Sequence, residues 1–336
     1  MTANTVNGSG NGARSGAQTL VLLAAPLNHL ILQALAERPK QQEELRRETG
    51  SPPQSTLRAQ LKRLVDLGAI EKHRRNRFPG VLDYELTASG RELLAVAGSL
   101  EQWLWRAPDG SLSLGDNAAK AAIKALAEGW STTMLRALAA RPLSLTELDR
   151  VISALSYPSL ERRLGALRLA GLVEPRPSDG RGTPYAVIDW LRQGVGPLAA
   201  AARWERRHLS QLSPPIGPID IEAALLLAVP LLSLPAELSG TCRAAIHLPN
   251  GKRHLVGVVV VVADGEIASC STSLEGDHSA WALGSISAWL SAVVEHDVDG
   301  LELGGDCALA SALVEGLHRA LFRPPRNAVS ADAPLT

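Results

Sequence analysis

The chain has 336 residues, 46% of them hydrophobic, which is enough for two or three domains with cores of their own. No stretch reaches the roughly 18 uninterrupted apolar residues of a membrane-spanning helix, so we expect no membrane span. Three widely spaced cysteines, Cys242, Cys270 and Cys307, argue against a disulfide framework and a zinc ribbon, and we expect them to be buried and inert. This composition favours a cytoplasmic protein.

The net charge of zero conceals a division along the chain. Residues 1–208 contain 28 Lys and Arg against 20 Asp and Glu, whereas residues 209–336 contain 6 against 14. A basic front part suits a polyanionic partner, although a solvated charged surface explains the charge equally well.

The first elements predicted are helices. The polar residues 1–20 indicate a disordered tail, and apolar residues at helical spacing then predict a helix that ends before Pro39. A second, short helix is expected over residues 41–48, ending near Gly50. Both helices would leave an apolar face for packing.

A third helix is predicted from an apolar stripe at Leu57, Leu61 and Leu64, with Ser51 or Ser55 available as its N-cap. A helix, a short helix, a turn and a basic third helix is the order of a helix-turn-helix. The opposite face carries the candidate DNA-binding residues Gln54, Ser55, Arg58, Lys62 and Arg63.

A pair of strands joined by a basic loop follows, over residues 69–75 and 81–86. Three arginines lie near the loop tip, Arg74, Arg75 and Arg77. No core partner for them is evident in the sequence, and their charge suits phosphates or a narrow minor groove. We expect this loop to bind DNA as a wing.

The same pattern recurs 103 residues later without a gap. Residues 31–72 and 134–175 share 14 identities over 42 aligned positions, spaced as core and turn residues, so one small helical fold is used twice. Strands over residues 172–174 and 184–188 would follow, with Asp189 as the N-cap of the next helix. The candidate DNA-binding residues of this copy are Ser159, Arg162, Arg163, Arg168, Arg176 and Arg181.

The order of these motifs in both copies resembles the winged-helix regulators of the HxlR type, which are related to the MarR group. The likeness spans residues 24–208 and rests on the glutamate–leucine pairs 44–45 and 147–148, the leucine-rich third helices, and residues 67–70 and 83–90. It implies a transcriptional regulator, a repressor or an activator, that binds double-stranded DNA. The family usually pairs two chains, so either a homodimer or a monomer with an internal pseudo-dimer is implied.

Beyond a proline-rich linker, strands are predicted over residues 241–247, 255–263 and 266–273, then a helix over 279–294, a short strand over 300–303 and a helix over 308–321. Five valines at 258–262 predict a strand buried on both faces. This order resembles the sterol carrier protein type two fold, which implies a small apolar or lipid-like effector. Candidate ligand-binding residues, which ordinary core packing explains better, are Leu225, Val229, Trp281, Leu283, Trp289, Leu290 and Val293.

No nucleophile elbow, phosphate-binding loop or metal-ligand spacing is evident, so we predict no enzyme activity, no cofactor and no metal. The fold class expected is α+β. The alternative function is a protein-interaction or lipid-binding module whose winged helices no longer bind DNA. The domains expected are a tail (1–20), a winged helix (21–106), a linker (107–117), a second winged helix (118–210), a linker (211–218), a sterol-carrier-like domain (219–325) and a tail (326–336).

Overall fold

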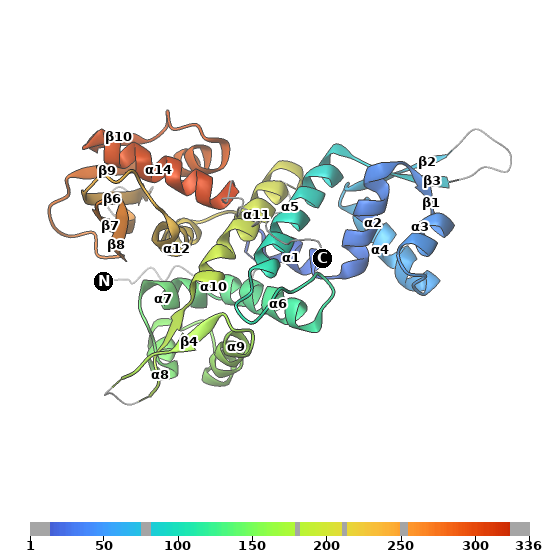
Figure 1. Ribbon diagram of the computed structural model, residues 1–336, viewed down its shortest axis with the longest axis horizontal. Helices are drawn as coiled ribbons and strands as arrows, with labels where there is room; N and C mark the ends of the chain where they lie inside the picture. Colours follow the sequence, from blue (N-terminus) through green and yellow to red (C-terminus); the bar gives the residue numbers. More distant parts are fainter. Residues whose placement is uncertain (1–13, 75–81, 179–181, 210–213, 249–254, 323–336) are drawn as a thin grey trace, which may run out of the picture. The chain divides into compact units, whose positions relative to one another are not determined.

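The structure is a computed structural model that describes residues 14–74, 82–178, 182–209, 214–248 and 255–322 (Figure 1). The chain divides into two compact units, Met1–Leu227 and Ala228–Thr336. Each unit mixes helices with small sheets, as an α+β protein does.

The first unit begins with a helix-turn-helix followed by two wing strands and a long helix. The elements are α1 (Ala17–Leu23), α2 (Pro26–Glu37), β1 (Lys40–Gln41), α3 (Gln42–Glu48), α4 (Gln54–Asp66), β2 (Ile70–Arg74), β3 (Leu82–Leu86) and α5 (Ala88–Trp105). The strands form a sheet in the order β1-β3-β2, and the predicted stripe of leucines on α4 is buried. The short strand β1 was not predicted, because two residues carry no periodicity.

A second set of elements in the same unit follows the same order. These are α6 (Asn117–Ser131), α7 (Met134–Ala140), α8 (Leu145–Val151), α9 (Tyr157–Leu169), β4 (Val173–Pro175), β5 (Tyr185–Val187), α10 (Asp189–Gln193) and α11 (Val195–His208). Helices α8 and α9 begin and end 103 residues after α3 and α4. An isolated bridge between Leu143 and Tyr185 occupies the place of the Lys40–Tyr84 pair of β1 and β3.

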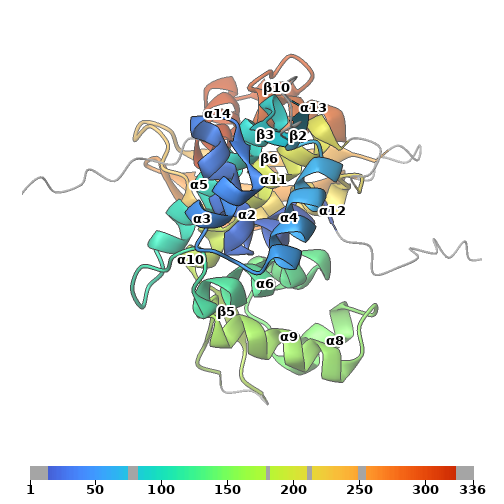
Figure 2. The same ribbon diagram turned by 90° about the vertical axis from the view of Figure 1, so that its right-hand side faces the viewer.

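The two sets meet through equivalent helices, because α5 packs on α11 and α1 packs on α6 (Figures 1 and 2). The Trp103 indole donates to the carbonyl of Trp190 at 2.7 Å, and the Trp204 indole donates to the carbonyl of Ser89 at 2.8 Å. The two bonds are equivalent in the two copies. Trp204 lies 101 residues after Trp103, and Trp190 lies 101 residues after Ser89, the same offset that separates Tyr84 from Tyr185. The sets are therefore joined by an approximate twofold, as in an isologous dimer interface.

The start of the chain was predicted wrongly as a tail up to residue 20, because residues 14–23 belong to the fold. Leu20, Leu22 and Leu23 of α1 are buried. The buried carboxylate of Glu205 on α11 accepts hydrogen bonds from Gly16 N at 2.7 Å and Thr19 Oγ1 at 2.6 Å. A carboxylate at this position satisfies free N–H groups at the start of α1. The polar composition of the preceding residues concealed this short helix.

Two predicted helix caps are also wrong. Helix α4 has Pro53 at its N-cap and no side-chain cap, while Ser51 lies in the turn with φ +54°. Asp189 lies within the first turn of α10, after Ile188 at the N-cap. A proline before a helix fixes the backbone φ where the chain enters the helix.

Helix α12 (Pro218–Ala228) begins where the third domain was expected, yet its first part is bound within the first unit. Glu222 pairs with Arg136, Asp220 pairs with Arg14, and Arg192 donates to the carbonyl of Leu226 at 2.9 Å. The division between the compact units therefore falls after Leu227, and not in the predicted linker over residues 211–218.

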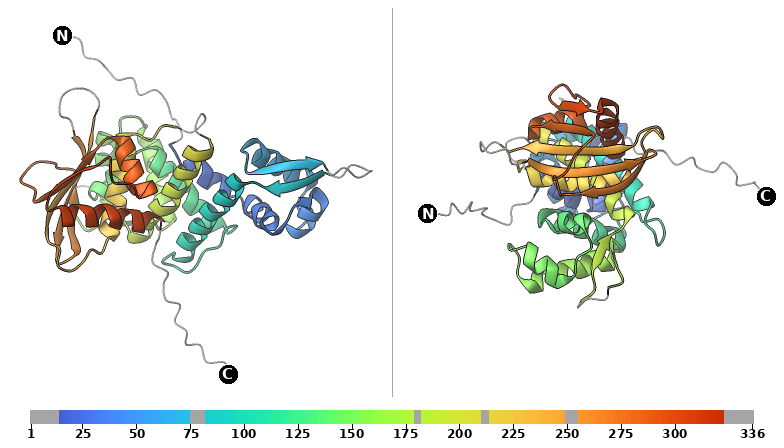
Figure 3. Two further views of the ribbon diagram at one scale, coloured as in Figure 1. Left: turned by 90° about the horizontal axis from the view of Figure 1, so that it is seen from above. Right: turned by 90° about the vertical axis from the view of Figure 1, so that its left-hand side faces the viewer.

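The second unit is a five-stranded sheet with helices over one face (Figure 3). Its elements are η1 (Val229–Leu231), β6 (Gly240–His247), β7 (Leu255–Ala263), β8 (Glu266–Ser271), β9 (Ala280–Gly284), α13 (Ile286–Leu290), the π-helical turn η2 (Ser291–Glu295), β10 (Glu302–Gly305) and α14 (Cys307–Phe322). The strand order is β10-β9-β6-β7-β8, with β6 and β9 parallel and the other pairs antiparallel.

The helix predicted over residues 279–294 is partly wrong, because its first third is strand β9. Burial alternates along this strand, and Trp281 lies over Gly304 of β10, where any Cβ would meet the ring. Ser285 then caps α13 by accepting from Ala288 N at 3.1 Å. Four of the five valines of strand β7 are buried as expected, on both faces, and Val261 is 36% exposed.

The cysteines also differ from the expectation that all three are buried. Cys242 is buried on β6, Cys270 is half-buried and Cys307 is exposed at the start of α14. Burial raises the pKa of the Cys242 thiol to about 12, so this thiol stays protonated at neutral pH.

We expect Trp103→Phe and Trp204→Phe to lower the free energy of unfolding by similar amounts, about 1–3 kcal/mol each, because each removes a buried hydrogen bond from an indole N–H to a backbone carbonyl. Urea denaturation followed by circular dichroism measures this loss. The matched control is Trp105→Phe, since Trp105 is 62% exposed and its loss should change stability by less than about 0.5 kcal/mol. Equal effects from all three variants would contradict the twofold role of the two bonds.

Candidate nucleic-acid interface

The outer face of α4 gathers the residues predicted to contact DNA in the first copy. Arg58 and Arg63 are exposed, and among the described residues neither forms an ion pair. Lys62 is exposed and pairs with Asp66 at 2.6 Å. Gln54 and Ser55 are exposed in the first turn. The structure thus places all five predicted side chains on the solvent side of one helix.

A buried lysine holds the elements behind α4 together. Lys40 of β1 is almost fully buried, with its ammonium 2.8 Å from Glu37 of α2 and 2.5 Å from Glu48 of α3. The hydrogen bonds from Lys40 to these carboxylates raise the pKa of its side chain. The second copy has buried Leu143 at the equivalent position. Sequence reasoning missed this lysine, since nothing in the local pattern shows that its partners surround it.

The wing of the first copy is only partly described. Arg74 ends β2, whereas Arg75 and Arg77 lie outside the described residues. In the second copy Arg176 is exposed and pairs with Glu174 at 2.7 Å, and Arg181 lies outside the described residues.

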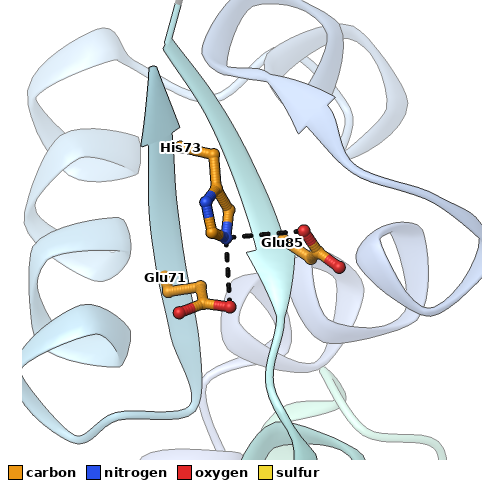
Figure 4. A group of neighbouring side chains, drawn as sticks. All are labelled: Glu71, His73 and Glu85. Atoms are coloured by element: carbon orange, nitrogen blue, oxygen red, sulfur yellow. Dashed lines mark ion pairs between the residues drawn. The ribbon is translucent and has the colours of Figure 1, made fainter. Parts of the chain in front are cut away.

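The strands β2 and β3 bring three exposed side chains together, as Figure 4 shows. Glu71 and Glu85 lie opposite each other, and His73 Nε2 lies 3.0 Å from the Glu71 carboxylate and 3.5 Å from that of Glu85. Two carboxylates directly opposite repel each other, and His73 bridges them when it is protonated. Their ligand atoms lie within 4.8 Å of one another, so these are residues that could hold a divalent cation. The sequence showed only an i, i+2 pair, because Glu85 joins through strand pairing.

The outer face of α9 differs from that of α4. Arg162 is exposed, Ser159 is half-buried, and Arg168 is exposed with Nη1 3.4 Å from the Tyr185 hydroxyl. Arg163 is turned back toward α6, where its guanidinium pairs with Glu128 at 3.3 Å and its side chain is only 15% exposed. This side chain supports the helix, in contrast to the DNA contact expected of it.

A capping box fixes α8, the helix before α9. The Ser144 hydroxyl accepts from Glu147 N, and the Glu147 carboxylate accepts from Ser144 N at 2.8 Å. The backbone N–H of Ser144, together with Arg141 and the Ser144 hydroxyl, lowers the pKa of Glu147 from 4.5 to about 2. Only the charged form of Glu147 is therefore favoured by folding.

The geometry of the first copy is that of a winged helix with a basic third helix, and a comparison with known families agrees. Residues 23–109 match the family model of the HxlR-like helix-turn-helix. The match covers α2 to α5 and supports an HxlR-type regulator, as the sequence resemblance implied for this part. No curated protein matches the chain. In helix-turn-helix proteins the recognition helix enters the major groove, and α4 has the position of that helix in the HxlR-like region.

The residues predicted to bind an apolar ligand are either buried or half-buried. Trp289 is buried, with its indole donating to the Ala245 carbonyl at 2.9 Å, and Leu225 and Val229 are also buried. The half-buried members are Trp281, Leu283, Leu290 and Val293.

Among the described residues, no single helix is long and apolar enough to cross a membrane, and one bent pair, α1 with α2, meets that test only when both helices are counted together.

We expect Ser144→Ala to lower the free energy of unfolding by about 1 kcal/mol through loss of the cap. Glu147→Gln should also destabilise the protein above pH 4.5, since a carboxyl with a lowered pKa contributes stability that is lost as pH falls toward 2. Thermal unfolding of wild type and variant between pH 2 and 7 measures the difference, which should shrink to nothing at the acid end. A difference that is constant with pH would show that the charge of Glu147 has no part in it.

Proposed function

We propose that this protein is a DNA-binding transcriptional regulator whose reading helices, α4 and α9, each enter a major groove of duplex DNA. The observation that carries the proposal is the HxlR-like match over residues 23–109, together with the exposed Arg58, Lys62 and Arg63 on α4. Arginine and lysine on a helix in the major groove contact guanine edges and neighbouring phosphates. Such a regulator would act in the cytoplasm, and the proposal includes no enzymatic step.

The second set of elements supports a second winged helix in the same chain. Its helices α8 and α9 have the lengths and register of α3 and α4, and the Leu143–Tyr185 bridge repeats the strand pairing of the first copy. The reciprocal tryptophan bonds pair the copies in the manner of two subunits. A monomer with this internal pseudo-dimer would contact half-sites spaced by about 10 base pairs or a multiple of it.

The wings are proposed to hold the DNA backbone. Arg74 ends β2 close to the loop, and Arg176 begins the loop of the second copy. Arg75, Arg77 and Arg181 are assigned to the same role on sequence alone. Arginines at such positions contribute to affinity through release of counterions, independently of base sequence.

The acidic second unit is proposed to bind a small apolar effector, in keeping with its resemblance to the sterol carrier protein type two fold, and so to regulate DNA binding. Its support is the sheet with helices over one face and the half-buried apolar residues Leu290 and Val293 on that helical layer. An effector acts on DNA binding only to the extent that it binds one conformation more tightly than another.

A protein-interaction module is the second candidate function. Helix α9 exposes Tyr157, which is 45% accessible, and Leu169, which is 85% accessible, at its two ends. Exposed apolar residues of this size are found at protein-binding surfaces, although single ones are also common on ordinary surfaces. The basic face of α4 has no role in such a module.

We expect Arg58→Ala to weaken binding to a selected duplex by about tenfold or more, since a bidentate arginine–guanine contact contributes about 1–3 kcal/mol. Fluorescence anisotropy over a series of salt concentrations measures the affinity and its salt slope. The matched control is Arg319→Ala, which removes an exposed helical arginine from the acidic unit. Equal, unaltered binding by both variants would rule out α4 as a reading helix and favour the interaction module.

For the effector, we expect a long-chain fatty acid or a sterol to raise the unfolding temperature of the full chain, because a ligand that binds only the folded state stabilises it. Differential scanning fluorimetry with dilution series of each compound measures the shift. Val293→Asp places a charge among the proposed contact residues and should abolish the shift, whereas no shift in the wild-type protein with either compound would remove this ligand class.

A further inference from the structure

Helices α4 and α9 occupy equivalent positions in the two copies, but their exposed side chains differ. They have the same length, lie 103 residues apart in register, and bury identical leucines, Leu57 with Leu160, Leu61 with Leu164 and Leu64 with Leu167. The same leucine stripe is buried in both helices, although α4 packs on α2 and β2 whereas α9 packs on α6, α8 and β4. Because the buried residues are alike, the exposed positions are where the two helices can differ in what they recognise.

Nearly every exposed position differs in chemistry. Arg58 of α4 is replaced by Glu161 in α9, and the following Ala59 by Arg162. Lys62 and Arg63 are replaced by the small residues Gly165 and Ala166, and Asp66 by Leu169. The positive charges on α4 thus lie in the middle of the helix at positions that α9 leaves neutral or acidic.

The ion pairs increase this difference. Arg163 lies on the flank of α9 and is held by Glu128 of α6, so Arg162 and Arg168 remain as its exposed cations beside the exposed carboxylate of Glu161. Arginine reads guanine O6 and N7, whereas a glutamate accepts a hydrogen bond from the cytosine amino group. The two helices are therefore suited to different base pairs.

The approximate twofold sets the orientation of the two helices. The bonds from Trp103 to Trp190 and from Trp204 to Ser89 relate the copies as two subunits of a symmetric dimer are related. In a dimer of identical chains this arrangement selects an inverted repeat, because both reading helices carry the same residues. Here the backbone is nearly symmetric and the contacting residues are not.

We propose that one chain binds a two-part duplex site with unlike halves, in which α4 reads guanines through Arg58 and Arg63 and α9 reads a cytosine through Glu161. The protein then lies on its site in one direction only. This inference rests on the proposed DNA binding and specifies the kind of sequence that is bound.

The test is selection from a random duplex library by the full chain, compared with a grafted variant. In the graft the exposed face of α9 receives the residues of α4, through Glu161→Arg, Arg162→Ala, Gly165→Lys and Ala166→Arg, while the buried leucines stay. We expect the wild-type protein to select two unlike halves. The graft should instead select an inverted repeat of the half that belongs to α4.

A single substitution keeps the test independent of whether the graft folds. Glu161→Gln lies outside the core and should relax the preference at one base pair in one half by about tenfold, with the other half unchanged. The matched change Arg58→Gln should act in the other half only. Unfolding midpoints equal to that of the wild type exclude a general loss of structure.

The outcomes separate this inference from the function on which it rests. If the wild type selects no sequence at any salt concentration, DNA binding itself is wrong and the inference falls with it. If it selects a palindrome or a single half, or if Glu161→Gln alters no base pair, DNA binding remains and the unlike half-sites are ruled out. Two unlike halves that the graft makes alike would establish the inference.

Discussion

The pairing of α5 with α11 is the interaction on which the arrangement of the first unit depends. Each helix supplies a buried tryptophan, and its indole N–H bonds to a backbone carbonyl of the other copy, Trp103 to Trp190 in α10 and Trp204 to Ser89 at the start of α5. These bonds satisfy the indole N–H groups inside an apolar contact. The start of the chain joins the same contact, since Glu205 on α11 binds the first turn of α1. Two small domains, each with a modest core, become one compact unit in this way.

Apolar periodicity predicted much of the fold, because the features concerned are local. The leucine stripe at Leu57, Leu61 and Leu64 fixes both the existence and the face of α4, and the ungapped repeat transfers those bounds to α9. For the candidate interface, the same stripe indicated which side chains face solvent. The stripe did not predict the orientation of Arg163, because the guanidinium of this residue pairs with Glu128 on another helix.

What the sequence could not predict depends on distant partners. Residues 280–284 contain alanine, tryptophan and leucine, which suit a helix, but pairing with β6 and β10 makes them a strand. Lys40 is an ordinary charged residue until β1 carries it between two glutamates, and Glu85 meets His73 only through the register of the wing strands. The indole bonds from Trp103 to the carbonyl of Trp190 and from Trp204 to that of Ser89 likewise join positions that no local window contains.

The twofold contact within one chain also changes how assembly depends on the amount of protein. Two separate subunits pair in proportion to the square of their concentration, so a dimeric assembly falls apart when molecules are few. Here the partner helices are tethered by the segment between α5 and α6, and their effective concentration is set by the length and stiffness of that segment and not by the amount of protein. Each chain therefore contains the paired copies even when a cell holds few molecules. The amount of the paired form rises linearly with expression.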